Sequence, residues 1–298
     1  MKKISVILLA VCTAGVLSAY ETMDEAYKAA SVYRNEKNYK KAFDAFKEAA
    51  KLSKKPSQKA NAEYMSGIVL CEDKQYNRGI AQLRKTLAAA PTAGLRVSCQ
   101  FHIAYYLGVM KKYGEAIAEM RKVRDYGNGE VKSRLIDRAD CYIGNYLMAL
   151  RRYNDAIDIV RDSCNSEDTV AAFMALRISY LAYKELKTNE GRMTAVNGLL
   201  NLKDPQPHMY FTARKYAFEL ARALKNHEEA LKYADEIVTN SELSDSQRAY
   251  GVFYKALCYS SLHDKRKELA QWKLLRNCGV KYLENVAANN LRRLHKKK

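Results

Sequence analysis

Residues 37–42 read Lys-Asn-Tyr-Lys-Lys-Ala, and phrases of the same kind return three times along the chain. They are Lys-Gln-Tyr-Asn-Arg-Gly at 74–79, Lys-Lys-Tyr-Gly-Glu-Ala at 111–116 and Arg-Arg-Tyr-Asn-Asp-Ala at 151–156. The tyrosines stand at 39, 76, 113 and 153, and an apolar stretch with helical spacing lies on both sides of each. A fixed period of this length is typical of helix pairs that stack into a solenoid. We therefore expect a turn between two helices at each copy.

Counting on by 37 from Tyr153 places the later turns near Glu190, His227 and Asp264. All four prolines fall between the expected repeats, where they interrupt no helix. The pattern predicts an all-α fold, a right-handed α-solenoid of about seven helix-turn-helix repeats with a C-terminal capping helix at 281–298. The repeats are clear over 23–170 and degenerate over 171–280, and no strand is needed.

The first expected pair shows how the helices would pack. Small residues at Ala30, Ala42 and Ala49 let two helices approach closely, and Tyr33 and Phe46 fill the gaps that remain. These five residues resemble the tetratricopeptide repeat (TPR) family, which places small and aromatic residues at these positions. The resemblance covers nearly the whole chain after residue 19. It implies an array that binds other proteins or peptides.

Residues 1–19 have the pattern of an export signal. Lys2 and Lys3 precede an apolar run over 4–17, and Ser18-Ala19 provides a small-residue cleavage site. The run is shorter than the roughly 20 residues that a membrane-spanning helix needs. We predict cleavage after Ala19 and a periplasmic or extracellular location for residues 20–298. Lipidation at Cys12 and an uncleaved anchor are the alternatives.

The composition is strongly basic, with 51 Lys+Arg against 33 Asp+Glu and a formal net charge of +18. Such a surplus indicates either attraction to polyanions or simply solubility, and composition alone does not separate the two. Six cysteines follow Cys12, and none forms a CxxC pair. We expect mostly buried free thiols, and only Cys99 and Cys141 are expected near the same level of neighbouring first helices. The six are Cys71, Cys99, Cys141, Cys164, Cys258 and Cys278.

No catalytic or metal-binding motif is present. The sequence lacks GxSxG, HExxH, GxGxxG and the phosphate-binding GxxxxGK[ST] pattern. Its five histidines have no metal-ligand spacing. His227, followed by two glutamates, has acid–base capacity, but it takes the place of Tyr39 and Tyr113, which favours a packing or helix-end role. We expect no enzyme activity, no cofactor, no metal and no small-molecule substrate.

The first candidate surface is the edge that stacked turns would form. A row of cations there would suit an anionic polymer or an anionic membrane surface. The alternative is that these cations only satisfy the negative pole of the preceding helix. The residues are Lys37, Lys40, Lys41, Lys74, Arg78, Lys111, Lys112, Arg151 and Arg152, continued by Lys187, Arg192, Lys225, Lys265, Arg266 and Lys267.

The second candidate surface is the concave face that, by the family resemblance, the first helices line. Aromatics with a few arginines and an asparagine suit the binding of a peptide, unless some of the tyrosines pack between helices instead. The selected residues are Tyr27, Arg34, Tyr64, Phe101, Tyr105, Arg138 and Asn145, beside Ser31, Ile68 and Met148. Tyr27 and Tyr64 replace the Lys/Asn clamp that some family members use, so capture of a C-terminal carboxylate is not supported.

These surfaces lead to two functional hypotheses. The first is a non-catalytic protein–protein interaction scaffold of the bacterial envelope or exterior, with a partner peptide or protein in the concave face. The second is binding of an anionic polymer or membrane surface through the cationic edge. An accessory or tethering subunit of an enzyme is a third reading. Salt separates the first two, because a polyanion is released steeply as salt rises.

Overall fold

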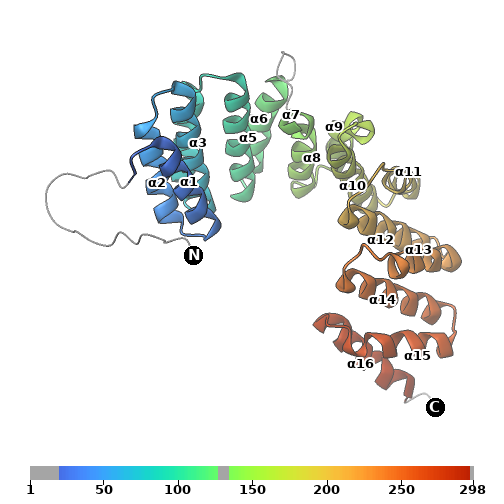
Figure 1. Ribbon diagram of the computed structural model, residues 1–298. Helices are drawn as coiled ribbons and strands as arrows, with labels where there is room; N and C mark the ends of the chain where they lie inside the picture. Colours follow the sequence, from blue (N-terminus) through green and yellow to red (C-terminus); the bar gives the residue numbers. More distant parts are fainter. Residues whose placement is uncertain (1–19, 127–133, 296–298) are drawn as a thin grey trace, which may run out of the picture. The chain divides into compact units, whose positions relative to one another are not determined.

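The computed structural model describes residues 20–126 and 134–295, so the predicted export signal at 1–19, with Cys12, lies outside the described residues. Within the described ranges the regular structure is entirely helical (Figure 1). The chain divides into two compact units, one ending at Tyr106 and the other beginning at Leu107. Each unit is described by itself below.

Antiparallel helix pairs fill the first unit. Their bounds are α1 (Met23–Asn35) with α2 (Tyr39–Leu52), and α3 (Pro56–Glu72) with α4 (Tyr76–Ala89), while α5 (Ala93–Val109) begins here and ends in the second unit. Each helix packs on its neighbour in the chain, α1 on α2, α2 on α3 and α3 on α4. Pro56 stands at the first position of α3, where its missing N–H breaks no hydrogen bond.

The second unit continues the same arrangement. It holds α6 (Tyr113–Asp125), α7 (Arg134–Asp137), the pair α8 (Ala139–Ala149) and α9 (Tyr153–Val160), the short 3-10 helix η2 (Asp162–Asn165), α10 (Thr169–Glu185) with α11 (Asn189–Leu200), α12 (Pro207–Ala223) with α13 (His227–Thr239), α14 (Asp245–Ser261) with α15 (Lys265–Leu274), the 3-10 turn η3 (Leu275–Asn277) and α16 (Lys281–His295). The predicted solenoid of helix pairs with a final capping helix is confirmed.

The turn inside each pair has one recurring geometry. After α1 the N–H of Lys37 donates to the carbonyl of Arg34 and that of Asn38 donates to the carbonyl of Tyr33, at 2.9 and 2.8 Å. These two bonds form a Schellman motif, which satisfies the last carbonyls of a helix and requires a left-handed residue. Lys37 takes that conformation, with φ of 60°. The same motif recurs with its left-handed residue at Lys74, Lys111, Arg151, Lys187, Lys225 and His263.

The first four second helices begin at the predicted tyrosines 39, 76, 113 and 153, and the three later turns lie near the predicted positions. His227 does open α13 as expected, whereas α11 begins at Asn189 and not Glu190, and α15 begins at Lys265 and not Asp264. Both helices start one residue away from the position that a constant step of 37 gives, because the later repeats are not 37 residues long. The steps from Tyr153 are 36, 38 and 38 residues, from the helix starts 153, 189, 227 and 265.

Close packing of α3 on α4 explains one departure from the repeat pattern. Gly79 stands where the family usually has alanine, and a Cβ there would lie 2.2 Å from Sγ of Cys71 and 2.8 Å from the carbonyl oxygen of Gly67. No real Cβ tolerates such distances, so the two helices can approach this closely only because residue 79 lacks a side chain.

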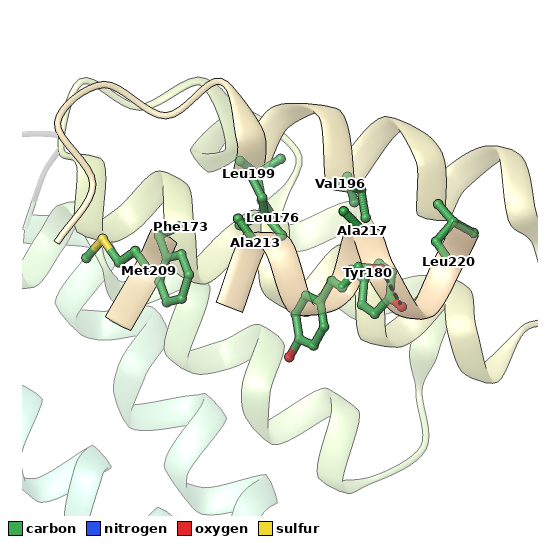
Figure 2. Packing of buried hydrophobic residues seen from close by; sticks show 11 residues of the cluster. Phe173, Leu176, Tyr180, Val196, Leu199, Met209, Ala213, Ala217 and Leu220 are labelled. Atoms are coloured by element: carbon green, nitrogen blue, oxygen red, sulfur yellow. Dashed lines mark hydrogen bonds between the residues drawn. The ribbon is translucent and has the colours of Figure 1, made fainter. Parts of the chain in front are cut away.

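A core of the second unit joins α10, α11 and α12 (Figure 2). The rings of Tyr180 and Tyr216 stack there with centroids 4.2 Å apart. Arg192 is also buried, only 8 % exposed, and its guanidinium donates to the hydroxyl of Tyr180 at 3.2 Å and to Oδ1 of Asn189 at 3.1 Å. This corrects the prediction that Arg192 belongs to the exposed cationic edge, because its side chain turns inward onto the tyrosine.

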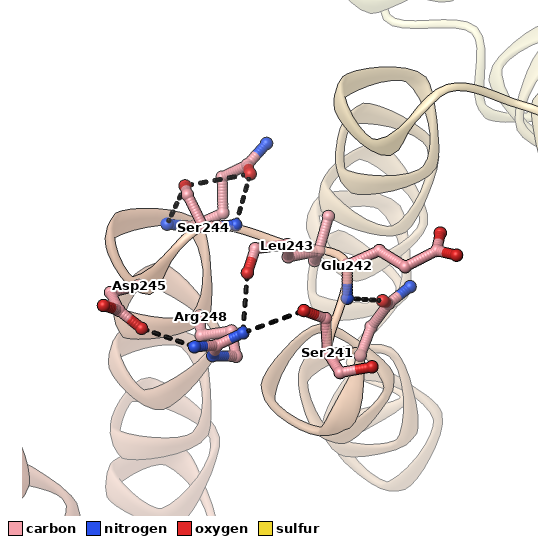
Figure 3. A network of polar contacts seen from close by, with 8 residues as sticks. Ser241, Glu242, Leu243, Ser244, Asp245 and Arg248 are labelled. Carbon is pink, nitrogen blue, oxygen red and sulfur yellow. Dashed lines mark hydrogen bonds and ion pairs between the residues drawn. The ribbon is translucent and has the colours of Figure 1, made fainter.

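The connectors between pairs are held by local polar contacts, as the segment between α13 and α14 shows (Figure 3). Arg248 donates to the carbonyls of Leu243 and Ser241 at 2.6 and 3.4 Å and pairs with Asp245. Ser244 and Gln247 form a reciprocal capping box at the start of α14. The connector therefore sets where the next pair begins.

The six described cysteines are free, in agreement with the prediction of unpaired thiols. Cys71, Cys99, Cys141 and Cys258 are buried. Burial raises the pKa of Cys71, Cys99 and Cys141 to about 12. In the part of the chain that the structure covers, none of the helices combines the length and the apolar character required to cross a membrane.

Candidate partner-binding face

The first helices of the first unit, α1, α3 and α5, carry four of the predicted partner-binding residues, Tyr27, Arg34, Tyr64 and Tyr105. We call the surface around these four residues the first-helix face. Burial raises the pKa of Tyr27 and of Tyr64, and the charge of the nearby Arg34 opposes that rise in both. The three side chains from α1 and α3 therefore share one electrostatic environment.

A bidentate ion pair joins α1 to α3 on this face. Nε of Arg34 donates to Oε2 of Glu72 at 2.7 Å, and Nη2 donates to Oε1 of the same carboxylate. The side chains of Arg34 and Glu72 are 36 % and 26 % exposed, so the pair is reachable from solvent. Fork-to-fork geometry of this kind holds the guanidinium in one orientation. Glu72 was not selected from the sequence, because no local motif marks a partner 38 residues away.

A second polar contact joins α3 to α5. The hydroxyl of Tyr64 lies 3.0 Å from Nδ1 of His102, and the same nitrogen lies 2.8 Å from the carbonyl oxygen of Ser98. Because a carbonyl only accepts, Nδ1 carries the proton in this arrangement and the tyrosine oxygen is a second acceptor. Burial lowers the pKa of His102, so the ring is neutral at pH 7. His102 is another residue of the face that sequence reasoning missed.

Aromatic rings continue the face along α5. Tyr105 is 37 % exposed and stacks on Phe101 with centroids 6.5 Å apart, while Tyr106 meets Tyr105 edge to face at 5.2 Å. Phe101 and Ile68 differ from the prediction, since they are only 5 % and 4 % exposed. Ile68 on α3 and Phe101 on α5 lie beneath the exposed residues of the face, because neighbouring helices cover the sides of these two helices on which they stand.

A shallow depression lies between the N-terminal halves of α1 and α3. Its volume is about 300 Å³, and Tyr27 forms one wall. The ring of Tyr27 is held in place by an edge-to-face contact with Phe46, at 5.1 Å between centroids. The other lining residues are Met23, Asp24, Lys28, Gln58 and Asn61. Apart from Tyr27 these residues carried no sequence signal, because polar residues on a solvated helix surface are the ordinary case.

The predicted residues of the second unit are engaged in bonds of their own. Arg138, at the start of α8, donates from Nε and Nη2 to the two carboxylate oxygens of Asp168 at 2.8 and 3.2 Å. Asp168 in turn caps α10 by accepting from the N–H of Val170. Asn145 donates to the carbonyl of Cys141 in its own helix at 3.1 Å. Arg138 therefore links consecutive first helices, as Arg34 does in the first unit.

The nine cations selected for the turn edge are all exposed. Lys37, Lys74, Lys111 and Arg151 follow the end of a first helix, where a positive charge favours the negative pole of that helix. The other five stand at the beginning of a second helix, the positive pole, where a cation is unfavourable. They are Lys40 and Lys41 on α2, Arg78 on α4, and the N-cap residues Lys112 of α6 and Arg152 of α9. Helix-pole stabilisation thus accounts for only the first group.

Consecutive turns meet in the second unit. A depression of about 250 Å³ is lined by residues 151–155 of one turn and by Leu186 of the next. The cations of this unit are partly offset by nearby acids, since Lys112 lies 3.6 Å from Glu115 and Arg152 pairs with Asp155. The edge is therefore continuous there and carries charges of both signs.

A larger cavity opens where α9 is cut short. This helix has eight residues and passes into η2, which leaves about 740 Å³ between α9, α10 and α11. Leu176 and Ala172 form an apolar floor, and Sγ of Cys164 lies 3.8 Å from the hydroxyl of Ser179 at one side. Among the described residues no group of three or more His, Cys, Asp or Glu side chains is placed to hold a metal ion.

No protein-family model matches the sequence, and no curated protein matches it. Solved structures do match. The C-terminal part of a TPR repeat-containing protein from Cytophaga hutchinsonii is 15 % identical with a TM-score of 0.59, over 87 % of this chain and 98 % of that chain. The apo form of the quorum sensor NprR from B. thuringiensis is 15 % identical with a TM-score of 0.61, over 92 % and 82 %. The type IV pilus biogenesis factor PilW is 14 % identical with a TM-score of 0.54, over 78 % and 99 %. The chain therefore has a TPR-like α-solenoid fold.

Proposed function

We propose that the chain is a non-catalytic scaffold that holds a partner peptide or protein on its first-helix face. The observation that carries the proposal is the grouping of three partly exposed tyrosines, Tyr27, Tyr64 and Tyr105, around the accessible Arg34–Glu72 ion pair. Rigid aromatic side chains supply contact area at little entropic cost, and an oriented guanidinium adds directional hydrogen bonds. Stacked helix pairs present such surfaces to protein partners in general.

The geometry favours an extended segment with apolar side chains as the ligand. The depression beside Tyr27 has room for a side chain, and the exposed ring of Tyr105 offers a second apolar contact further along the face. Donors and acceptors of the Arg34–Glu72 pair lie between the first helices, where they can meet the backbone of such a segment.

We place this function in the envelope or exterior of a bacterium. The support is the export-signal pattern of residues 1–19 together with the fold that the chain shares with a pilus biogenesis factor. Alkaline phosphatase fused after residue 30 tests the location, because that enzyme becomes active only after export. An inactive fusion that becomes active when a known export signal replaces residues 1–19 contradicts the location and leaves the binding proposal standing.

Photo-crosslinking in intact cells tests the face itself. A photoreactive amino acid is placed at Tyr27 or Tyr105, and in control strains at Asp44 on α2 or Lys85 on α4, which are exposed on second helices. We expect one protein to be captured from both face positions and from neither control. Capture of the same protein from the second helices at equal yield would contradict the proposal.

The captured partner then permits a quantitative measurement. Truncating an aromatic anchor at an interface costs about 1–2 kcal/mol, so Tyr27→Ala and Tyr105→Ala are each expected to weaken binding roughly 5- to 30-fold. Lys85→Ala is the matched control and should leave the Kd unchanged. Unchanged affinity in both tyrosine variants would move the binding site elsewhere.

A second candidate function is the binding of an anionic polymer along the turn edge. Six of the seven left-handed turn residues are Lys or Arg and the seventh is His263, although an L-residue in this conformation costs roughly 1–2 kcal/mol. Glycine would avoid that penalty, so the repeated cation has a role beyond the turn geometry: it stabilises the negative pole of the first helix and would also attract a polyanion. Within each unit a row of such cations suits a linear polyanion.

Binding of polyphosphate at increasing salt tests this second function. We expect the affinity to fall steeply with salt, and the variant Lys37→Gln/Lys74→Gln/Lys111→Gln to flatten that dependence. The control removes as many exposed lysines away from the edge, with Lys54, Lys59 and Lys85 changed to Gln. Equal effects of the two triple variants would mean that net charge, and not the edge, is responsible. Peptide binding on the first-helix face should respond to salt much less.

A further inference from the structure

Positive charge is concentrated at the C-terminal end of the chain. Residues 265–298 hold eleven Lys or Arg and two Glu, so they contribute 11 − 2 = +9, half of the net charge of +18. In the described part of this stretch, eight cations are exposed on α15, α16 and the segment between them. They are Lys265, Arg266, Lys267, Lys273, Arg276, Lys281, Arg292 and Arg293.

Both glutamates of the stretch accept hydrogen bonds from within it, and Glu268 is buried. Glu268 is 3 % exposed, and its Oε1 accepts from Nε1 of Trp272 at 3.1 Å and from Nη2 of Arg293 at 2.7 Å. Oε1 of Glu284 accepts from the N–H of Gly279 at 3.0 Å. Glu268 thus neutralises Arg293, and Lys267 lies 3.4 Å from Asp264, whereas within the described residues Lys273, Arg276 and Lys281 take part in no ion pair.

Two large apolar side chains lie among these cations. Leu274 is 65 % exposed and Tyr282 is 61 % exposed, the highest values for large hydrophobic residues in the described chain. Leu274 ends α15 and Tyr282 lies in the first turn of α16 (Figure 1), and we call the stretch that includes both, residues 273–282, the basic connector. It contains Lys273, Arg276 and Lys281 and no acidic residue.

The exposure of Leu274 and Tyr282 does not come from loose packing. Their immediate neighbours Leu275 and Leu283 are 1 % and 0 % exposed and belong to a core with Trp272. The basic connector is therefore anchored from beneath at both ends, and its two apolar side chains are held outward. Covering these two side chains would remove apolar surface from water, which is favourable.

We propose that the basic connector docks on an anionic lipid bilayer. Lys273 and Lys281 directly precede the two apolar residues in the sequence and are exposed, so each end of the connector carries a cation that can meet a lipid phosphate. Tyrosine is favoured at the level of the headgroups, and a leucine beside it reaches the acyl boundary. The cations alone would be enough to bind a nucleic acid or another soluble polyanion, and such a ligand would leave Leu274 without a binding role.

This surface is separate from the first-helix face and from the turn edge. It lies on the connector that follows a pair, not on a turn inside one, and none of its residues takes part in either candidate site. The proposal is independent of the proposed partner binding.

Co-sedimentation with vesicles tests the proposal. The protein is taken as residues 20–298, which include every described helix, because the apolar run at 4–17 would itself enter a bilayer. Vesicles contain either phosphatidylcholine alone or phosphatidylcholine with 30 % phosphatidylglycerol. We expect binding only to the anionic vesicles. Equal binding to both kinds, or to neither at 50 mM NaCl, would overturn the proposal.

Two variants locate the binding surface. Leu274→Ser/Tyr282→Ser removes the apolar contacts, and we expect roughly tenfold weaker binding. Lys273→Gln/Arg276→Gln/Lys281→Gln removes three charges, and at about fivefold each we expect roughly 100-fold weaker binding. The matched controls are Leu150→Ser/Leu262→Ser, which are exposed leucines elsewhere, and the triple Gln variant of Lys54, Lys59 and Lys85, which are exposed lysines away from the connector and from the turn edge.

The two variants also distinguish a membrane from a soluble polyanion. Loss of vesicle binding in both connector variants, with both controls unchanged, supports a bilayer. If the charge variant loses binding but the Leu274/Tyr282 variant keeps it, the surface recognises anionic charge in general and the proposal fails. Circular dichroism of every variant shows whether it is folded, and all of the replaced side chains are exposed.

Discussion

A single methyl group at residue 79 is expected to destabilise the chain. The Cβ of Gly79→Ala would lie 2.2 Å from Sγ of Cys71, 2.8 Å from the carbonyl oxygen of Gly67 and 3.0 Å from the backbone N of Cys71. Two of these three atoms are backbone, and Cys71 is 1 % exposed, so no flexible group can move aside. The helices α3 and α4 must therefore separate.

The magnitude follows from two opposing effects. Forcing an extra carbon into a close-packed site costs about 3 kcal/mol when backbone has to shift. Alanine returns about 1 kcal/mol over glycine through its better helix propensity. The net expectation is a loss of about 2 kcal/mol in the free energy of unfolding, measured by urea titration with circular dichroism at 222 nm.

Gly114→Ala is the matched control. Gly114 lies in the first turn of α6, and an added Cβ would meet nothing within 4 Å. Only the propensity effect applies there, so this variant should gain about 0.5–1 kcal/mol. The two substitutions are chemically identical and are expected to have opposite signs. If Gly79→Ala is neutral or stabilising, the close approach of α3 and α4 at this point is refuted.

A double-mutant cycle adds a finer check. Cys71→Ala removes the Sγ atom but leaves the two backbone contacts, so it should relieve part of the penalty of Gly79→Ala. We expect a coupling of about 1 kcal/mol between the two substitutions, which is ordinary for residues in contact. Strict additivity would show that the thiol is not the atom that the new methyl group meets.

Three further predictions concern the turns, the thiols and the histidine of the first-helix face. Lys111→Gly should stabilise the chain by about 1 kcal/mol in urea titration, because glycine takes the left-handed conformation without strain, and a destabilised variant would contradict the turn geometry. Burial raises the pKa of Cys71, Cys99 and Cys141 to about 12, so these thiols should resist iodoacetamide at pH 8 in the folded chain. The partly exposed Cys278 should react, and equal rates measured by mass spectrometry would contradict the burial of the other three. Burial lowers the pKa of His102, so below pH 6.5 the unfolded chain binds a proton there that the folded chain does not. The free energy of unfolding should therefore fall between pH 7 and 5, and it should fall less in His102→Gln. An identical pH profile of the two proteins would contradict the burial of this ring.

The solenoid and its turns were predictable because their signals are local. The signals are the turn phrase, the apolar spacing on each side of it and the absence of proline from the predicted helices. All three act within one repeat, so a single stretch such as 37–42 with its flanking residues already specifies a helix, a turn and another helix. A constant step of 37 placed the later turns to within one residue of the helix starts at Asn189 and Lys265, and the difference arises because such a step cannot detect a missing or added residue.

The candidate sites depended on contacts between residues about one repeat apart. Arg34 meets Glu72 and Tyr64 meets His102, each across 38 residues, and no local pattern records which side chains of stacked helices will touch. Exposure was equally undetermined, because a neighbouring helix decides whether a residue at a surface position is covered. Residue type and helical position alone therefore marked Phe101 and Arg192 as accessible, and helix packing buried both while it left Leu274 and Tyr282 in solvent.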